Sequence, residues 1–489
     1  MVSYLYNIFL LIVTIHASQY PLPVSKCPRE DSLRKCLNQY QIKGPVIFRD
    51  NFMAYNKDIK FEYNKLFIYF PVAFVHPIDE FDVQNAVKCA AKLNIPIVAR
   101  SGGHSSEGYG MGDKDCYLVV HLVNLNKFSI DRNSQTAVIG MGNTLKSLYY
   151  KVHQYGFAFP AGTCPNIGVG GHITGGGMGL LNRKFGLSTD NILDAQIVLA
   201  NGTIVYNAKK YPELFWAIQG AGNAGYGIVI ALTLRIYPIQ KIVTSLTFEY
   251  DFDQIPLIFS VMNQLGNSFH QNLTLYIVVY SDPLSASVTG LYLGSASELQ
   301  PHMQEFIKLS IPKSVSYVEN DLYNIQIEGS EILISDFIKS KSFYIDSRGL
   351  SYEGSKYFMR FMKSFKCKLH SEILLIGGGR VNEMRRNESA FVHRGFLYHI
   401  AMFAHLPGAH SKHSELCFQE LKNFSQHFQK NYASYENYQI LIDRQLDNWQ
   451  CRYYGKNFEK LVEIKRKYDP YNLFHWNQSI PTNTNISCN

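Results

Sequence analysis

The sequence predicts an α+β fold with two regions of different texture, and three observations predict it. Segments of helix and strand periodicity alternate through residues 19–240, separated by glycine-rich turns. Over 241–430 glycine becomes scarcer, and aromatic-rich strands alternate with helical segments. The last segment, 431–489, combines a helix with an extended tail. With 489 residues, 46% of them hydrophobic, the chain can bury a large core and form two or three domains.

Residues 1–18 have the pattern of a secretory signal peptide. An apolar run from Tyr4 to Ile15 precedes the small residues Ala17 and Ser18. The run is shorter than the roughly 20 apolar residues that a membrane span requires, and no other segment qualifies. We therefore expect a secreted, extracellular protein without a membrane partner.

The cysteines and the glycosylation sequons fit an oxidising compartment. No cysteine pair has zinc-site spacing, and their odd number leaves at least one without an intramolecular disulfide partner. Six Asn-X-Ser/Thr sequons also support secretion. The cysteines are Cys27, Cys36, Cys89, Cys116, Cys164, Cys367, Cys417, Cys451 and Cys488, and the sequons begin at Asn201, Asn272, Asn387, Asn423, Asn477 and Asn485.

The first region begins with a predicted β-α-β unit. Residues 67–77 are strand-rich, 78–94 have an acidic start and helical apolar spacing, and 95–104 form a buried strand that enters a glycine turn. Further strands are predicted over 116–126 and 135–142.

An amphipathic helix is predicted over 144–156, with Thr144 as its N-cap and Gly156 as its C-cap. Residues 191–205 have the pattern of two strands joined by an Asn-Gly pair, a strong hairpin signal. We expect helix, glycine loop and strand in turn over 211–238.

The second region contains predicted strands at 274–281 and 395–406 and a helix at 413–432. Near the C-terminus, 453–481 reads as a helix that an Asp-Pro pair stops, followed by an extended tail.

Residues 220–225, GAGNAG, match the G-x-G-x-x-G pattern of dinucleotide sites. That site requires strand, glycine turn and helix in this order, so that the helix N-terminus meets the pyrophosphate. Here a helix precedes the loop and a strand follows it. We therefore reject a Rossmann-type site and interpret the stretch as a flexible turn.

Residues 99–104, ARSGGH, do follow a predicted strand. Their two glycines free backbone amides to point into one space, which suits an anionic oxygen, with Arg100 and Ser101 as further donors. A tight structural turn is the alternative interpretation.

The most glycine-rich stretch is GTCPNIGVGGHITGGGMGLLNRKFG, residues 162–186. Because glycine loses much entropy on folding, such a run is destabilising unless something requires it. A linker would mix serine and threonine with the glycines, and Cys164 with His172 alone do not make a metal site. We interpret the run as a surface on which a large flat cofactor lies against bare backbone.

Four histidines gather at His399, His405, His410 and His413, but their spacing fits no common metal-ligand pattern. We expect no metal site. The net charge of +8 is mild for this length, and no basic stripe or stacking motif indicates nucleic-acid binding.

In its motifs the sequence resembles the berberine-bridge-enzyme-like, FAD-linked oxidases, a family that includes oligosaccharide oxidases. The matching segments are PIVARSGGHSSEG, GTCPNIGVGGHITGGGMGLLNRKFGLSTDNILDA, PELFWAIQGAGNAGYGIV and YYGKNFEKLVEIKRKYDPYNLFHWNQSIP, in the family's order. The resemblance implies an FAD-binding domain of the vanillyl-alcohol-oxidase type, with two subdomains, in 19–240 and completed by 431–489. It also implies a substrate-binding domain in 241–430, in which helices cover an antiparallel sheet.

The resemblance implies FAD attached by two covalent bonds, from His104 to the flavin 8α-carbon and from Cys164 to C6. Eight cysteines then remain for disulfides, and the resemblance implies Cys36 with Cys89 as one pair. Two tethers also imply a raised reduction potential and an open active site. Further cofactor contacts are expected from Arg100, Ser101, Gly102, Gly103, Ser105, Gly162, Thr163, Gly168, Gly170, Gly171, His172, Gly175, Gly176, Gly177, Gly179, Asn191, Gly227, Ile228 and Asn477.

The substrate side departs from the family pattern. A position that is often aromatic is Ser106, and the tyrosine of the family's GGGYG is Met178. The family strand LYKIQY reads LYHIAMF here, which places His399 and Ala401 at the lysine and glutamine positions. A family position that affects oxygen access is Ile167, which leaves oxidase or dehydrogenase behaviour open.

The family's YxNY pair is retained as Tyr435 and Tyr438, and the resemblance implies that one of them accepts the substrate hydroxyl proton. A phenol has an unperturbed pKa of about 10, so a nearby cation must favour its ionised form. His399 could do so only when protonated, as in an acidic fluid. A satisfied strand histidine is the alternative interpretation.

The sequence thus predicts a secreted, monomeric flavoprotein oxidase. It would transfer a hydride from an alcohol carbon of a small molecule, with the C1–OH of a sugar as one candidate, to FAD. Molecular oxygen would reoxidise the flavin and give hydrogen peroxide. One alternative keeps the flavin and takes phenolic or allylic alcohols or alkaloid-like amines. Another is a catalytically degenerate flavin-bearing or sugar-binding protein.

Overall fold

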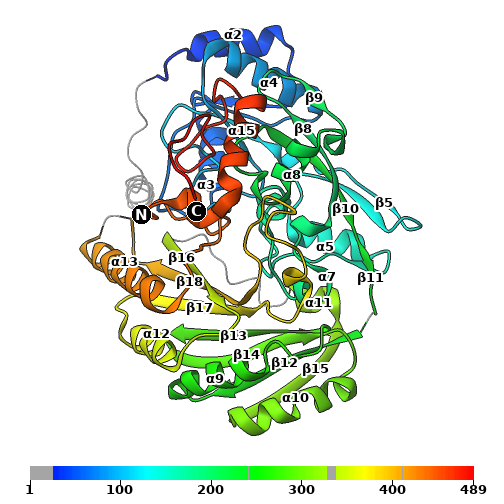
Figure 1. The fold of residues 1–489 in the computed structure, drawn as a ribbon. Helices are drawn as coiled ribbons and strands as arrows, with labels where there is room; N and C mark the ends of the chain where they lie inside the picture. Colours follow the sequence, from blue (N-terminus) through cyan, green and yellow to red (C-terminus); the bar gives the residue numbers. More distant parts are fainter. Residues whose placement is uncertain (1–25, 241, 328–336, 410, 489) are drawn as a thin grey trace, which may run out of the picture.

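The computed structural model describes residues 26–240, 242–327, 337–409 and 411–488, so the predicted signal peptide lies outside the described residues. Figure 1 shows the predicted α+β fold as two parts. The N-terminal half and the C-terminal helix form the upper part, and a large sheet with its helices forms the lower part. None of the helices in the described ranges has the length and apolarity to cross a bilayer.

The first sheet has four strands in the order β1-β2-β4-β3, and β2, β4 and β3 run parallel. The predicted β-α-β unit is present as β2-α4-β3, but β4 lies between its two strands. The Asp79 carboxylate caps α4 by accepting the amide hydrogens of Phe81 and Asp82. The elements are α2 (Glu30–Gln39), β1 (Val46–Phe48), α3 (Phe52–Lys60), β2 (Ala73–Val75), α4 (Glu80–Leu93), β3 (Ile97–Arg100) and β4 (Leu118–His121).

The second sheet is antiparallel, with five strands in the order β5-β6-β10-β8-β9. Thr144 is the N-cap of α5, as predicted, but the C-cap is Gln154 and not the predicted Gly156. The predicted hairpin is β8 and β9, joined by residues 199–203 and not by a two-residue turn. The elements are β5 (Phe128–Asp131), β6 (Thr136–Gly140), α5 (Leu145–His153), β7 (Phe157–Ala158), α6 (Val169–Gly175), α7 (Asn182–Phe185), β8 (Ile192–Val198), β9 (Ile204–Val205), α8 (Pro212–Ala221), β10 (Ile228–Arg235) and β11 (Tyr237–Pro238).

The third sheet, which we call the large sheet, is antiparallel and has seven strands in the order β15-β12-β14-β13-β17-β18-β16. Helices α9, α10, α12 and α13 cover its outer face, and its inner face looks toward the N-terminal half (Figure 1). The elements are β12 (Ile242–Tyr250), α9 (Ile255–Leu265), β13 (Leu273–Ser281), β14 (Leu284–Tyr292), α10 (Ala296–Ser310), β15 (Ser314–Asp321), α11 (Leu322–Ile327), β16 (Phe337–Asp346), α12 (Tyr352–Ser364), β17 (Lys368–Leu375), β18 (Phe396–Leu406) and α13 (Lys412–Tyr432).

The C-terminal segment returns to the N-terminal half. It contains α14 (Trp449–Tyr454) and α15 (Phe458–Tyr468), which ends before the predicted Asp-Pro pair. Its apolar side chains share one hydrophobic core with those of residues 27–236. A separate core, drawn mainly from residues 246–428, fills the space between the large sheet and its helices.

Four disulfides account for eight cysteines, and Cys164 is the one unpaired cysteine among the described residues. The predicted Cys36–Cys89 pair is confirmed. The other pairs are Cys27–Cys116, Cys367–Cys417 and Cys451–Cys488.

Candidate active site

A cavity of about 410 Å³ lies between the glycine-rich loops and the inner face of the large sheet. His104, in the loop after β3, and Cys164, in the loop before α6, both line it. The other predicted residues in its lining are Arg100, Ser101, Gly102, Gly103, Ser105, Gly162, Thr163, Gly168, Gly170, Gly171, His172, Gly227, His399 and Tyr438. The cavity lining does not include Gly175, Gly176, Gly177, Gly179, Asn191, Ile228, Tyr435 or Asn477.

The two glycine-rich loops touch backbone to backbone. A Cβ atom on Gly102 would lie 2.2 Å from the amide nitrogen of Gly168, so no larger residue fits at this contact. The Ser101 hydroxyl strengthens the contact, since it donates to the Met141 carbonyl at 2.6 Å and accepts the Gly170 amide at 3.3 Å. This contact holds the loops that carry His104 and Cys164 at the edge of one cavity.

Several glycines of the predicted cofactor surface serve the chain's own packing instead. A Cβ on Gly177, which has φ of +80°, would lie 2.1 Å from the Ser188 hydroxyl, and one on Gly179 would lie 1.8 Å from the Ala161 carbonyl oxygen. Gly171, by contrast, lines the cavity and has open space around it. The interpretation of the whole run as bare backbone under a cofactor therefore needs correction, because a tight internal turn requires part of it.

The remaining residues outside the lining also have structural contacts. The Asn191 amide donates to the Phe185 and Leu187 carbonyls, and Ile228 pairs with β8 inside the second sheet. Asn477 is exposed, and its backbone amide donates to Asp113.

His104 stacks on Tyr63, with ring centroids 4.4 Å apart. Burial lowers the pKa of His104 to about 4, so the imidazole is neutral near pH 7. A neutral ring nitrogen is the form that can bond to an electrophilic carbon.

Burial, with a smaller contribution from the Glu372 carboxylate, raises the pKa of the Cys164 thiol to about 11. His172 accepts the Gly162 amide at Nε2, at 2.9 Å, and its buried Nδ1 has no hydrogen-bond partner among the described residues. An unpartnered buried nitrogen in the cavity lining is a position at which a bound molecule can supply the missing hydrogen bond.

Arg100 lines the cavity, as predicted for a cofactor donor, and its buried Nε has no hydrogen-bond partner among the described residues, although its other guanidinium nitrogens are engaged inside the protein. Its buried guanidinium is 2.6 Å from the Asp58 carboxylate and 2.9 Å from Nδ1 of His121, and it also donates to the Asp58 carbonyl. Asp58, His76 and His121 could by geometry hold a metal ion. However, the guanidinium already supplies the positive charge there, which disfavours a metal cation.

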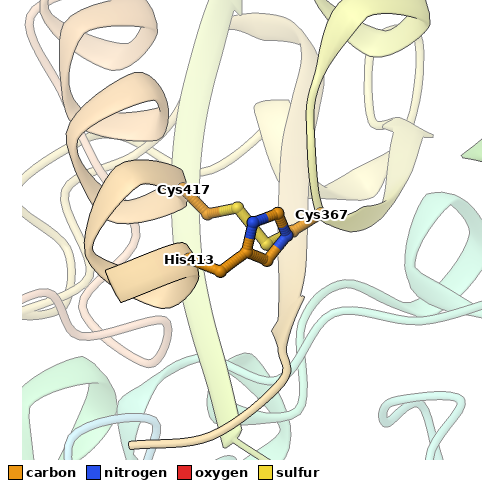
Figure 2. Close-up of side chains that lie close together, drawn as sticks. All are labelled: Cys367, His413 and Cys417. Carbon is orange, nitrogen blue, oxygen red and sulfur yellow. A yellow bond between two sulfur atoms is a disulfide. The ribbon is translucent and has the colours of Figure 1, made fainter. Parts of the chain in front are cut away.

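Figure 2 shows a second cluster of potential metal ligands, formed by Cys367, His413 and Cys417. Their ligand atoms lie within 4.8 Å of one another. The two sulfur atoms form a disulfide and are therefore not thiolate ligands. Of the four predicted histidines, His405 contacts His370 at 3.1 Å and His399 lines the cavity, while His410 lies outside the described residues.

The inner face of the large sheet forms the wall opposite the loops, and three cross-strand rows build it. The first row contains Tyr276, Leu374, His399 and Tyr344, and the second contains Val278, Glu372, Ala401 and Ser342. The third contains Tyr280, His370, Phe403 and Ser340. Rings stack within this third row, since His370 lies 4.8 Å from Phe403 and 5.8 Å from Tyr280 between centroids. The members of these rows that line the cavity are Tyr276, Leu374, His399, Glu372, Ala401, His370 and Phe403. The wall thus offers aromatic and apolar groups, two histidines and one carboxyl group.

The tyrosine pair is divided by the structure. Tyr438 is buried in the cavity lining, and its phenolic oxygen accepts the Gly177 amide at 2.8 Å. Tyr435 is 51% exposed, accepts a hydrogen bond from Asn448, and packs under the Arg452 guanidinium. Tyr435 is therefore not placed to touch a molecule in the cavity.

Burial raises the pKa of Tyr438 well above its ordinary value, despite the opposing effect of the Gly177 and Met178 amides. His399 lies 5.0 Å from Tyr438 between ring centroids, but burial and His393 lower the pKa of His399 to about 3. A neutral His399 cannot provide the cation that the sequence analysis sought for the phenolate.

Glu372 is the residue that sequence reasoning missed. It lines the cavity at the middle of β17, and burial raises the pKa of its carboxyl group above the ordinary value. A single acid in an apolar strand carries no motif, and the resemblance over 241–430 rested mainly on texture and on one strand, LYHIAMF, that does not contain Glu372. The one available signal was an acidic residue within KLHSEILL, a strand whose apolar residues predict that it is buried.

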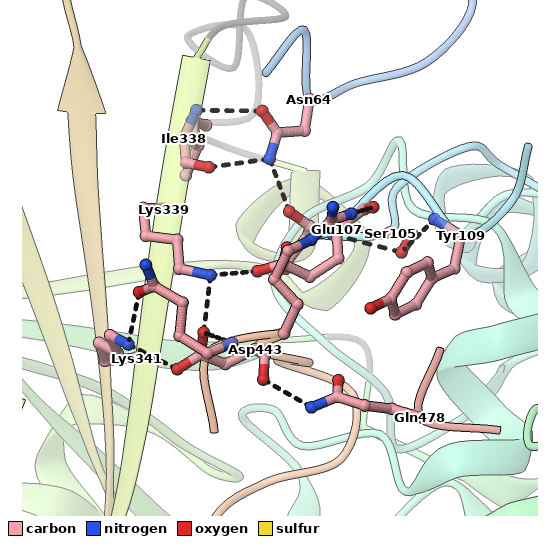
Figure 3. A network of polar contacts seen from close by, with 12 residues as sticks. Asn64, Ser105, Glu107, Tyr109, Ile338, Lys339, Lys341, Asp443 and Gln478 are labelled. Atoms are coloured by element: carbon pink, nitrogen blue, oxygen red, sulfur yellow. Dashed lines mark hydrogen bonds and ion pairs between the residues drawn. The ribbon is translucent and has the colours of Figure 1, made fainter. Parts of the chain in front are cut away.

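A buried ionic network joins the His104 loop, the large sheet and the C-terminal segment (Figure 3). Glu107 pairs with Lys339 of β16 and with Arg444, the latter at 2.6 Å. Asp443 lies 2.6 Å from the amines of both Lys339 and Lys341. We call these five residues the ionic junction.

Asn64 adds neutral contacts beside the ionic junction. Its side-chain amide donates to the Ser106 carbonyl at 2.6 Å and to the Ile338 carbonyl at 2.8 Å, and it accepts the Ile338 amide (Figure 3). The loop that carries His104 is thus fixed to β16, the edge strand of the large sheet.

The fold and this cavity define a flavin-dependent oxidoreductase, and comparisons with known proteins agree. The FAD binding domain family matches residues 71–206, and the family described as berberine and berberine like matches residues 434–481. The chain is 31% identical over 453 residues to monolignol oxidoreductase AtBBE-like 13 of Arabidopsis thaliana, which covers 84% of each chain. The chain belongs to the berberine-bridge-enzyme-like family of FAD-linked oxidoreductases.

Two further relatives differ in what their names report. Tetrahydroberberine oxidase of Berberis wilsoniae is 29% identical, with 92% of this chain and 94% of the relative covered. The solved structure of chitooligosaccharide oxidase is 26% identical, with a TM-score of 0.84, and the match covers 93% of this chain and 100% of that one. Family membership therefore gives the cofactor, FAD, but does not name the substrate.

Proposed function

We propose that the protein is an oxidase that removes a hydride from an alcohol carbon of a small, ring-bearing molecule. The observation that carries the proposal is the cavity itself, which His104 and Cys164 line on one side and the rows of the large sheet line on the other. The side with His104 and Cys164 holds the cofactor, and the side formed by the large sheet holds the substrate. Bound FAD supplies the hydride acceptor and passes the two electrons on to molecular oxygen, which becomes hydrogen peroxide.

We propose two covalent attachments, from the His104 imidazole and the Cys164 sulfur. Both residues line one cavity, the imidazole is neutral, and Cys164 is the unpaired cysteine of the described chain. The orphaned Nδ1 of His172 and the open space at Gly171 fit a polar, flat molecule beside them. These residues hold and orient the cofactor, and the ionic junction fixes the loop that carries His104.

The wall favours an aromatic or allylic alcohol over a sugar. Sugar recognition requires many hydrogen-bonding groups, whereas Tyr276, Leu374, Ala401 and Phe403 offer mainly apolar contact. The monolignol oxidoreductase similarity points the same way. Sugars and alkaloid-like amines remain the alternatives, with an inactive flavin carrier as a third, and the experiment below separates them.

Four disulfides support a protein of the secretory pathway, as the predicted signal peptide does, because such bonds persist in oxidising compartments. The exposed sequon residues Asn201, Asn387 and Asn423 are accessible to glycosylation. Ile167 lines the cavity and so lies where it can affect oxygen access.

Anaerobic mixing of the purified holoprotein with candidate substrates tests the proposal. We expect cinnamyl alcohol and 4-hydroxycinnamyl alcohol to bleach the flavin absorbance, and admission of oxygen to restore it with hydrogen peroxide release. Bleaching by cellobiose alone would show that the substrate is a sugar. Bleaching by an N-methyltetrahydroisoquinoline alone would show that it is an amine. If no compound bleaches the flavin, the protein is not an oxidase of these classes.

A further inference from the structure

The proposed reaction requires a group that accepts the substrate hydroxyl proton, and few side chains in the cavity lining can do so. Among the described residues that line it, Arg100 and Glu372 are the only ones of the Asp, Glu, Lys and Arg classes. Arg100 is paired with Asp58 at 2.6 Å, whereas Glu372 has no ion pair or side-chain hydrogen bond with any residue that the structure describes. Glu372 is therefore the one uncompensated acid that faces this cavity.

The sheet register places Glu372 at the centre of the substrate wall. It lies in the second row between Val278 and Ala401, neither of which can hydrogen-bond to it through a side chain. Its carboxylate also acts on the Cys164 thiol, whose pKa it raises. Since C6 and N5 of a flavin are bonded to the same carbon, a group near a C6-linked cysteine is near the hydride-accepting atom.

An acid left without a partner in an apolar wall destabilises the fold, because burial without compensation disfavours the charged form. Such groups are concentrated at functional sites, where a carboxyl group with a raised pKa can take a proton near neutral pH. Glu372 has this environment and this raised pKa.

Tyr438 is suited to a different task. Its oxygen accepts the Gly177 amide and has no cation beside it, so the phenol keeps its proton. A phenol in this state donates a hydrogen bond and does not accept a proton at neutral pH.

From these contacts we infer that Glu372 is the general base of the reaction and that Tyr438 donates a hydrogen bond to the substrate oxygen. The inference rests on the function proposed above. The Glu372 carboxylate takes the hydroxyl proton as the O–H bond breaks and the C=O double bond forms. The hydride leaves the same carbon with its electron pair for the flavin, so an alcohol yields a carbonyl product, one proton and one hydride.

The test compares Glu372→Gln with Tyr438→Phe and with Glu249→Gln, a control on the exposed position of β12. The measured quantity is the rate of anaerobic flavin bleaching by 4-hydroxycinnamyl alcohol, normalised to bound flavin. We expect Glu372→Gln to lower this rate about 100-fold or more and Tyr438→Phe about 10-fold. Glu249→Gln should leave it unchanged. Binding of the product aldehyde should stay intact in Glu372→Gln.

The pH profile separates a base from a packing residue. The wild-type rate should fall as pH falls through the pKa of Glu372, and this limb should disappear in Glu372→Gln. The titratable groups that face Glu372 are Tyr276 and Tyr280 from β13, His370 from β17, His399 and His405 from β18, and Cys164 and Tyr438. His370 and His399 are neutral above about pH 5, since burial lowers their pKa values to about 4 and about 3. A His405→Gln control, which should retain the limb, removes the remaining histidine.

A bleaching rate of Glu372→Gln within about threefold of wild type, or an unchanged acid limb, overturns the assignment while the proposed function stands. If the wild type is bleached by none of the alcohols, the proposed function fails first, and the role of Glu372 fails with it.

Discussion

The two walls of the cavity are built in opposite ways. We call the loop side the cofactor wall and the sheet side the substrate wall, after the roles proposed above. The cofactor wall comes from two short loops, SGGH and the run that begins at Gly162, and these loops contact each other directly at Gly102 and Gly168. The substrate wall comes from single residues on separate strands, which only the register of the large sheet aligns. A residue in the first wall is constrained by its neighbours in sequence, and a residue in the second is constrained mainly by its neighbours in space.

This difference predicts that the two walls tolerate substitution to different degrees. Replacing Gly102 would force the two loops apart, whereas replacing Ala401 or Val278 would change only the shape of the substrate wall. We therefore expect the cofactor wall to carry the motifs that family members share. We expect the residues of the substrate wall to differ between enzymes and to set substrate specificity.

The largest expected effect tests the cofactor wall alone. The double variant His104→Ala, Cys164→Ala should lose all flavin that stays with the protein after acid precipitation, because it removes both proposed attachment atoms. Each single variant should keep acid-stable flavin on a peptide of the other residue. Acid-stable yellow colour in the double variant would show that another residue carries the flavin.

The second effect tests the ionic junction that joins the two walls. Glu107→Gln should lower the free energy of unfolding by about 3 kcal/mol or more, because it leaves Lys339 and Arg444 without their shared buried partner. Urea unfolding of the holoprotein measures this loss of free energy. Asp31→Asn, which removes an exposed ion pair with Lys26, should change the free energy of unfolding far less, because solvent screens that pair. Equal losses in the two variants would contradict a buried, coupled junction.

The third effect tests the division of the tyrosine pair. Tyr438→Phe should slow flavin bleaching by about 10-fold, the effect of one lost hydrogen bond. Tyr435→Phe should change the rate less than about twofold, since its hydroxyl contacts Asn448 outside the cavity. A larger loss in Tyr435→Phe would mean that the C-terminal segment moves when substrate binds.

The smallest effect concerns pH and the junction again. Lys339 and Lys341 counter the effect of burial and hold the pKa of Asp443 at about 2. A lowered pKa contributes stability above the unfolded value near ~4, and this contribution is lost as pH falls toward 2. The destabilisation caused by Asp443→Asn should therefore be full at pH 6 and shrink as pH falls below about 4. A pH-independent difference between the unfolding curves would contradict this assignment.

Sequence reasoning found the parts that local chemistry encodes. The Thr144 cap follows from a short-range pattern, and the family motifs implied His104, Cys164 and the Cys36–Cys89 pair. The structure confirms the cap and the disulfide, and it places His104 and Cys164 in the lining of one cavity. Sequence reasoning did not find Glu372, because the identity of an inward-facing strand residue becomes meaningful only when the strand's partners are known.

Two other differences have the same origin. Arg100 lines the cavity, but its carboxylate partner, Asp58, lies 42 residues away, and no sequence pattern indicated that ion pair. Tyr435 and Tyr438 belong to one short motif and looked equivalent in the sequence, yet Tyr435 is exposed and Tyr438 is buried in the cavity lining.

The path of the chain also sets an order of events during biosynthesis. The loops that carry His104 and Cys164 are made early, but Tyr438, Asp443 and the residue that supports Asp443, Gln478, come from the last part of the chain. The Cys451–Cys488 bond can close only after residue 488 has been synthesised. A chain truncated near residue 430 would therefore keep His104 and Cys164 but lack the C-terminal residues that complete the lining of their cavity.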